Sequence, residues 1–202
     1  MWEPEGGNVD PPGATHACAT GAKNSGAQIH RFTPVTGTSQ QPDGSCIVRT
    51  PKADIGTEVV VNPAGLWARE VVALAGIKLP LIPTEHPYFV SEGIPAIEAL
   101  DRRLPSVADL DGEYYLRSQG NGLLVGANEK DVRVWAKHGT PLNFGHELFD
   151  DDLDQIEDNM MHAIDRVPAL GEAGVKRVIY GPMIWYPDSN AILLVSIFKS
   201  HV

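Results

Sequence analysis

Cysteines are few in this sequence, and long apolar runs and an excess of basic residues are missing. Its 202 residues include only Cys18 and Cys46, which form neither a disulfide framework nor a metal-binding spacing. No apolar run approaches the roughly 18 residues of a membrane-spanning helix. The 16 basic residues are outnumbered by 26 acidic ones, which argues against nucleic acid or an anionic membrane as a partner. These absences predict a soluble, acidic, globular protein.

Several strong functional motifs are also absent, among them GxGxxG, the P-loop, GxSxG and CxxC. The segment His146–Asp150, HELFD, has an aspartate where the zinc motif HExxH requires its second histidine, so we expect no metal site. The first ten residues show neither the basic nor the apolar part of a secretory signal. No mitochondrial transit peptide is visible either. We therefore expect a cytoplasmic protein, or one of the mitochondrial matrix if the source is eukaryotic.

The first part of the chain is typical of an α/β unit. Asp10 followed by two prolines predicts a helix that runs to about Ser25 and stops at Gly26. Short β-like segments follow, namely AQIHRF, PVTGTSQ, SCIVRT and DIGTEVVVN. The apolar run Val59–Asn62 predicts a strand covered on both faces. It leads into the turn PAGLW and a helix with Trp67, Val71, Leu74 and Ala75 on one face.

The second part, from about Leu79, favours an antiparallel sheet with a helix against it. Tyr114–Arg117 and Leu123–Gly126 read as a hairpin around a Gln-Gly-Asn-Gly turn. Asp151–Val167 carries one apolar stripe at helical spacing, Leu153, Ile156, Met160, Ile164 and Val167. VKRVIYGPM and AILLVSIF are expected to be strands. Taken together, the two parts of the chain predict an α/β plus α+β fold, with room for a pocket between the α/β unit and the antiparallel unit.

A few side chains qualify as catalytic candidates, although spacing alone decides none of them. His86 begins an aromatic, proline-bounded strand, EHPYFV, and fits a structural role or a catalytic one. Tyr114 and Tyr115 should face opposite sides of a sheet. Arg117 shares the face of Tyr115, where it is either a surface residue or a bidentate clamp for a substrate carboxylate. These residues alone do not define a reaction.

Longer motifs add a family resemblance. The ordered set VNPAGLWARE, LPLIPTEHPYFV, YYLRSQGNGLLVG, FGHELFDDDLDQIED, RVPALGEAGVKRVIYGP and YPDSNAIL resembles the dimethylglycine and sarcosine dehydrogenase/oxidase family. These are flavoproteins of the D-amino-acid-oxidase-like superfamily, and the match is collinear from about Gly6 to Leu193. The motif FGHELFDDDLDQIED favours the dimethylglycine branch. The resemblance implies a partial FAD-binding domain at 1–77, an antiparallel-sheet substrate domain at 78–182 and a partial return to the FAD domain at 183–202.

The resemblance also implies site residues and a reaction, oxidation of an N-methyl carbon of a small amino acid by FAD. His86 and Tyr114 match the active-site histidine and tyrosine of the family. The FAD-binding positions are the strand around Val35 and, in the PAGLW turn, Ala64, Gly65 and Trp67. Arg117 as a substrate clamp is our own inference from its position on the strand.

Parts of the family pattern have no counterpart in this sequence. The GxGxxG unit that holds the pyrophosphate would precede it, and the domain that binds tetrahydrofolate would follow it. The resemblance therefore implies that this sequence is the middle of a longer enzyme. The substrate of that enzyme would be a small N-methyl amino acid, and an electron-acceptor flavoprotein is a candidate partner. Two alternatives stay open: a non-catalytic relative like the regulatory subunit of pyruvate dehydrogenase phosphatase, and a fragment that neither binds FAD nor folds by itself.

Overall fold

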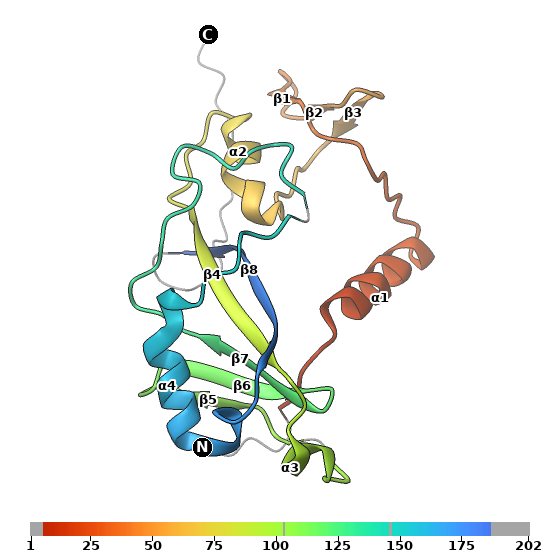
Figure 1. The fold of residues 1–202 in the computed structure, drawn as a ribbon. Helices are drawn as coiled ribbons and strands as arrows, with labels where there is room; N and C mark the ends of the chain where they lie inside the picture. Colours follow the sequence, from red (N-terminus) through yellow and green to blue (C-terminus); the bar gives the residue numbers. More distant parts are fainter. Residues whose placement is uncertain (1–5, 103, 146, 187–202) are drawn as a thin grey trace. The chain divides into compact units, whose positions relative to one another are not determined.

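A computed structural model of the chain describes residues 6–102, 104–145 and 147–186. Contacts group these residues into two units, the first made of 6–62 and 71–77 and the second of 63–70 and 78–186. Figure 1 shows the helices and strands of both units. The predicted division at 1–77, 78–182 and 183–202 stays a prediction. The predicted strand AILLVSIF lies outside the described residues.

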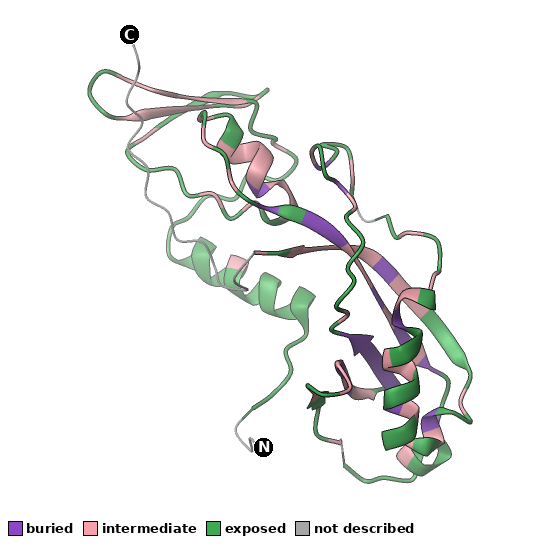
Figure 2. Cartoon of the chain, turned by 90° about the vertical axis from the view of Figure 1, so that its left-hand side faces the viewer, coloured by how far each residue is buried: buried purple, intermediate pink, exposed green. Residues whose placement is uncertain are grey.

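The first unit begins with helix α1 (Pro11–Asn24), and the predicted start and stop of this helix are confirmed. The Asp10 carboxylate accepts a hydrogen bond from the Gly13 N–H at 2.8 Å, which caps one of the free amides of the first turn. Gly26, at φ +90°, takes the left-handed conformation that lets the chain leave the helix. None of the α1 residues is buried, as Figure 2 shows.

A three-stranded antiparallel sheet completes the first unit, in the order β1 (Gly37–Gln40), β2 (Cys46–Arg49), β3 (Asp54–Thr57). Strands β1, β2 and β3 lie inside the predicted segments PVTGTSQ, SCIVRT and DIGTEVVVN, although Val35 itself precedes β1. Two other strand predictions are wrong. The run Val59–Asn62 is not a strand, since it pairs with none of the described strands, and Val59 and Val61 are 71% and 78% exposed. The segment AQIHRF likewise forms no strand.

The second unit is built on a five-stranded antiparallel sheet in the order β5-β6-β7-β4-β8. Its strands are β4 (Ile82–Ser91), β5 (Val107–Asp109), β6 (Tyr114–Gln119), β7 (Gly122–Ala127) and β8 (Val175–Trp185). The predicted hairpin is confirmed as β6 and β7, with Gln119 opposite Gly122. Gly120, at φ +61°, supplies the left-handed backbone that so tight a turn requires.

Short helices and 3₁₀ turns connect the strands. The 3₁₀ turn η1 (Gly65–Trp67) leads into α2 (Ala68–Ala73), so Trp67 precedes the helix in which it was expected. Helix α3 (Pro95–Glu98) follows β4. The helix predicted at Asp151–Val167 starts later than expected, as a 3₁₀ turn η2 (Asp154–Ile156) followed by α4 (Glu157–Arg166), and η3 (Pro168–Leu170) comes next.

The core of the second unit lies between α4 and one face of the sheet. Ile156 and Ala163 are at most 1% exposed and pack with buried side chains of the strands. The predicted apolar stripe is confirmed, because its remaining members, Leu153, Met160, Ile164 and Val167, pack against the same core. Burying one side chain such as Ile156 contributes about 1.5–3 kcal/mol. The mixed α/β architecture with antiparallel sheets confirms the predicted fold class.

Candidate active site

The second face of the five-stranded sheet, opposite α4, carries a group of polar and aromatic side chains. Tyr88 of β4 and Tyr115 of β6 both pair with Gly126 of β7, so all three project from the same face. His86 lies two residues before Tyr88 and therefore shares that face. Strand alternation thus brings His86 and Tyr115 together from positions 29 residues apart in the sequence.

His86 lies between two polar partners. Its Nε2 is 3.2 Å from the Tyr115 hydroxyl, and its Nδ1 is 3.2 Å from Oε1 of Glu129. The imidazole and phenol rings are nearly parallel, at 16°, with centroids 6.4 Å apart. At that separation the rings meet edge to edge through their hydrogen bond. The His86 side chain keeps 12% of its exposure, so a ligand can still reach it.

Tyr115 is the phenol that the structure places against His86. Burial raises the pKa of Tyr115 to about 12, and the charges of Tyr88 and Glu129 act in the same direction, while Arg117 opposes them. The phenol is therefore protonated at neutral pH, where its O–H can donate to His86. Gly126 makes this arrangement possible, since a Cβ there would lie 2.2 Å from Cζ of the Tyr115 ring.

Tyr114, the tyrosine predicted from the family resemblance, faces the other way. It is 0% exposed and belongs to the core cluster against α4. Its buried hydroxyl has no hydrogen-bond partner among the described residues. Burial also raises its pKa. The structure therefore does not bring Tyr114 together with His86, and a catalytic role for Tyr114 stays a prediction. Tyr115 is the tyrosine whose hydroxyl contacts His86.

Glu129 and Gln155 are site residues that sequence reasoning missed. Glu129 lies in the loop after β7, and Nε2 of Gln155 in η2 donates to its Oε1 at 3.1 Å. No motif surrounds either residue. The one signal in the sequence was the position of Glu129, two residues after the end of β7. Because β7 is the neighbour of the strand that carries His86, a loop at that end of β7 can reach the site.

The structure brings Arg117 to the face of Tyr115, as expected from strand alternation. Nη1 of Arg117 donates to Oε1 of Gln119 at 2.7 Å and to the Ser118 carbonyl at 3.3 Å. A substrate carboxylate would have to share or replace the Gln119 contact. Substrate binding by Arg117 stays a prediction.

The predicted FAD-binding positions Ala64, Gly65 and Trp67 lie at the start of η1 and within it. Gly65 has φ +54°, a backbone conformation that disfavours a side chain, and no heavy atom lies within 4 Å of the place a Cβ would take. Nε1 of Trp67 donates to the Pro141 carbonyl at 3.0 Å. Val35, in the first unit, is 40% exposed. Their contact with a cofactor stays a prediction.

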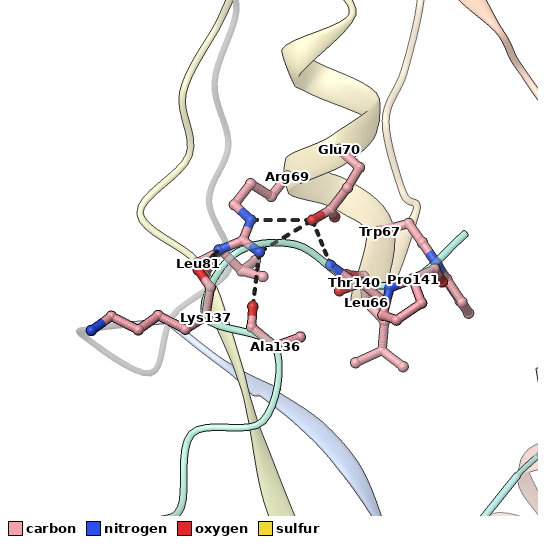
Figure 3. A network of polar contacts seen from close by, with 9 residues as sticks. All are labelled: Leu66, Trp67, Arg69, Glu70, Leu81, Ala136, Lys137, Thr140 and Pro141. Carbon is pink, nitrogen blue, oxygen red and sulfur yellow. Dashed lines mark hydrogen bonds and ion pairs between the residues drawn. The ribbon is translucent and has the colours of Figure 1, made fainter. Parts of the chain in front are cut away.

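A polar clamp holds the η1 turn in place (Figure 3). The Arg69 guanidinium donates to the carbonyls of Leu81, Ala136 and Lys137, at 2.9–3.3 Å. It also contacts Oε1 of Glu70, which accepts the N–H of Thr140 at 2.9 Å. The Thr140 hydroxyl in turn donates to the Leu66 carbonyl. Arg69 and Glu70 thereby fix the start of α2 to Leu81, just before β4, and to the loop at 136–141.

Replacing Arg69 with alanine is expected to lower the free energy of unfolding by about 2–4 kcal/mol, because it removes the donor to three carbonyls and the cation beside the Glu70 carboxylate. Urea unfolding followed by circular dichroism measures this change. The exposed Arg102 gives the control substitution Arg102→Ala. Equal stability of the two variants would contradict the clamp.

Two further features concern metals and membranes. Within 6–102, 104–145 and 147–186, no group of three or more His, Cys, Asp and Glu side chains is arranged to hold a metal ion. His146 of the HELFD segment lies outside these residues. No helix in the same ranges is long and apolar enough to cross a membrane.

Comparison with known proteins supplies a family context. The family model described as FAD dependent oxidoreductase matches residues 1–196. Mitochondrial dimethylglycine dehydrogenase of Mus musculus is 41% identical over 193 residues, which cover 93% of this chain and 22% of that protein. Mitochondrial sarcosine dehydrogenase of Homo sapiens is 35% identical over 198 residues, 96% of this chain and 21% of that protein. The chain thus spans about a fifth of the length of the curated relatives it matches.

A solved structure agrees with the sequence comparisons. The L-proline dehydrogenase of P. horikoshii superposes with a TM-score of 0.75 at 27% identity. The superposition covers 96% of this chain and 49% of that one. The similarity includes nearly all of the chain.

Proposed function

Because this chain belongs to the family of FAD-dependent oxidoreductases, we propose that it carries the substrate-facing part of an enzyme that oxidises an N-methyl group of a small amino acid. The observation that carries this proposal is the contact of His86 with both Tyr115 and Glu129. Dimethylglycine and sarcosine, which give two of the relatives their names, are the candidate substrates.

The described residues fit a flavin. His86 and Tyr115 present two nearly parallel rings on one sheet face, and neither ring is fully buried. The open space beside Gly65 lets a ligand approach the backbone of η1 closely. We assign these two places to the cofactor and its substrate. When bound, FAD supplies the hydride-accepting chemistry.

The task of the protein residues is to free the substrate amine of its proton, because its lone pair must form the iminium double bond as hydride leaves the methyl carbon. The ammonium proton passes to Oη of Tyr115 while the hydrogen of that hydroxyl passes to Nε2 of His86. The imidazolium that results lies 3.2 Å from the Glu129 carboxylate, which stabilises its charge. The imidazolium then releases this proton to solvent, which the partly exposed His86 ring can reach, and both side chains return to their starting state.

This arrangement favours the enzyme over a non-catalytic relative. A protein that acts only through its surface has no need of a nearly buried carboxylate in contact with a histidine, and the Glu129 side chain is 6% exposed. Burial of such a group costs stability unless it is well paired. The contact among these three residues therefore supports a chemical role.

We propose an electron-acceptor flavoprotein as the partner that reoxidises the flavin. The mouse and human relatives are mitochondrial by name, so we place a eukaryotic protein of this kind in the matrix and a bacterial one in the cytoplasm.

The proposed function is tested by titrating the purified chain with FAD while flavin fluorescence is followed, and then by adding substrate without oxygen. Saturable binding is expected, and so is loss of the flavin absorbance with dimethylglycine or sarcosine. Glycine, which lacks the N-methyl group, is the control and should leave the absorbance unchanged. A folded chain whose bound flavin is reduced by neither N-methyl amino acid would contradict the proposal.

A further inference from the structure

The Glu129 carboxylate is nearly buried, where a charged group costs folding free energy unless it is well paired. Its side chain is 6% exposed, and it lies in the loop between β7 and η2. Among the described residues, no lysine or arginine forms an ion pair with it, and its one ionisable partner within 4 Å is His86. A carboxylate buried against a single histidine suits a role that acts through that histidine.

The geometry at Glu129 is more specific than a simple ion pair. Nδ1 of His86 and Nε2 of Gln155 both contact the same carboxylate atom, Oε1, at 3.2 and 3.1 Å. A carboxylate oxygen accepts and the Gln155 amide nitrogen donates, so the Nδ1 atom of His86 must carry the hydrogen of a neutral imidazole. Its Nε2 then offers a lone pair to Tyr115.

Gln155 keeps this carboxylate from turning. Its amide nitrogen donates to Glu129, while its Oε1 lies 3.3 Å from the Tyr180 hydroxyl, whose single hydrogen is shared with Glu85. The amide therefore lies between the loop and strand β8, with its firmer hydrogen bond on the Glu129 side. An imidazole without such an acceptor can adopt either tautomer, and the Nε2–H tautomer would direct a hydrogen at Tyr115 instead of accepting one.

We propose that Glu129, held by Gln155, is a positioning residue that fixes His86 in the Nδ1–H tautomer and so directs the hydrogen of Tyr115 toward Nε2. The same logic applies to the carboxylate that orients the histidine of a serine-protease triad. The consequence for catalysis rests on the proposed function. The tautomer itself is a property of this chain with or without cofactor.

The tautomer can be read directly from nitrogen NMR of the chain labelled with ¹⁵N-histidine, at a pH at which titration shows the neutral ring. The His86 signal is assigned by its loss in His86→Asn, and the exposed His16 is the internal reference. The expected result is the Nδ1–H tautomer in the wild type and in Glu129→Gln, whose amide oxygen can take both hydrogen bonds. Glu129→Ala should show a mixture or the Nε2–H form.

Retention of the Nδ1–H tautomer in Glu129→Ala would overturn the proposal. If that variant does not fold, Glu129→Leu, which fills more of the space of the glutamate side chain but offers no acceptor, replaces it, and an unchanged His86 tautomer there has the same meaning. Neither measurement needs FAD or turnover, so a failure of the proposed function leaves the tautomer result intact. In the FAD-loaded protein, Glu129→Ala should lower kcat at least about tenfold, and Glu129→Gln should lower it less, because the amide keeps the tautomer and gives up only the charge that stabilises the imidazolium. Equal losses in the two variants would overturn the positioning role.

Discussion

Replacing His86 with alanine is expected to lower the rate of N-methyl oxidation at least about tenfold while the FAD content of the purified protein stays unchanged. His86 is the only described side chain that contacts both Tyr115 and Glu129 through hydrogen bonds. Its loss removes the acceptor of the Tyr115 hydrogen, so the substrate ammonium keeps its proton. The rate of flavin reduction by substrate measures this step.

The control for this prediction is His16→Ala, which changes an exposed histidine of α1 and should retain the wild-type rate. Flavin absorbance relative to protein after gel filtration measures the FAD content. An unchanged rate in His86→Ala would remove His86 from the mechanism. A loss of FAD in parallel with the rate would mean that His86 holds the cofactor instead.

The elements that the sequence predicts well are those defined by local chemistry. The α1 boundaries follow from Asp10 and Gly26, and the β6–β7 hairpin follows from its turn residues. The strand expected at Val59–Asn62 failed because an apolar run shows only that a segment can be buried. A strand also needs partners, and none of the described strands pairs with this segment.

The candidate site was predictable only in part, for a similar reason. His86 follows from the family motif, and the opposite orientations of Tyr114 and Tyr115 follow from strand alternation. Which of the two faces His86 depends on the register between β6, β7 and β4, which no local pattern specifies. Glu129 reaches the site through a loop that folds back 43 residues after His86, so its role appears only in three dimensions.

Replacing Gly126 with alanine is expected to lower kcat/KM at least about tenfold by moving the Tyr115 ring. A Cβ at this position would lie 2.2 Å from Cζ and 2.3 Å from the hydroxyl oxygen of Tyr115. The Gly126 backbone is paired with Tyr88 on one side and Tyr115 on the other, so the ring must give way. Its hydroxyl then leaves His86. Gly56→Ala, where the new Cβ meets only Ile47 at 3.9 Å, is the control.

A double-mutant cycle with Tyr115→Phe shows whether Gly126 acts through this hydroxyl. Tyr115→Phe should lower kcat/KM at least about tenfold by itself, and Gly126→Ala should add little to it, because the hydroxyl is already gone. Independent, multiplied losses would contradict this account. Tyr114→Phe makes the same deletion on the opposite face of the sheet. If it, and not Tyr115→Phe, lowered the rate, the tyrosine implied by the family resemblance would be the catalytic one, and the sheet register would have to differ.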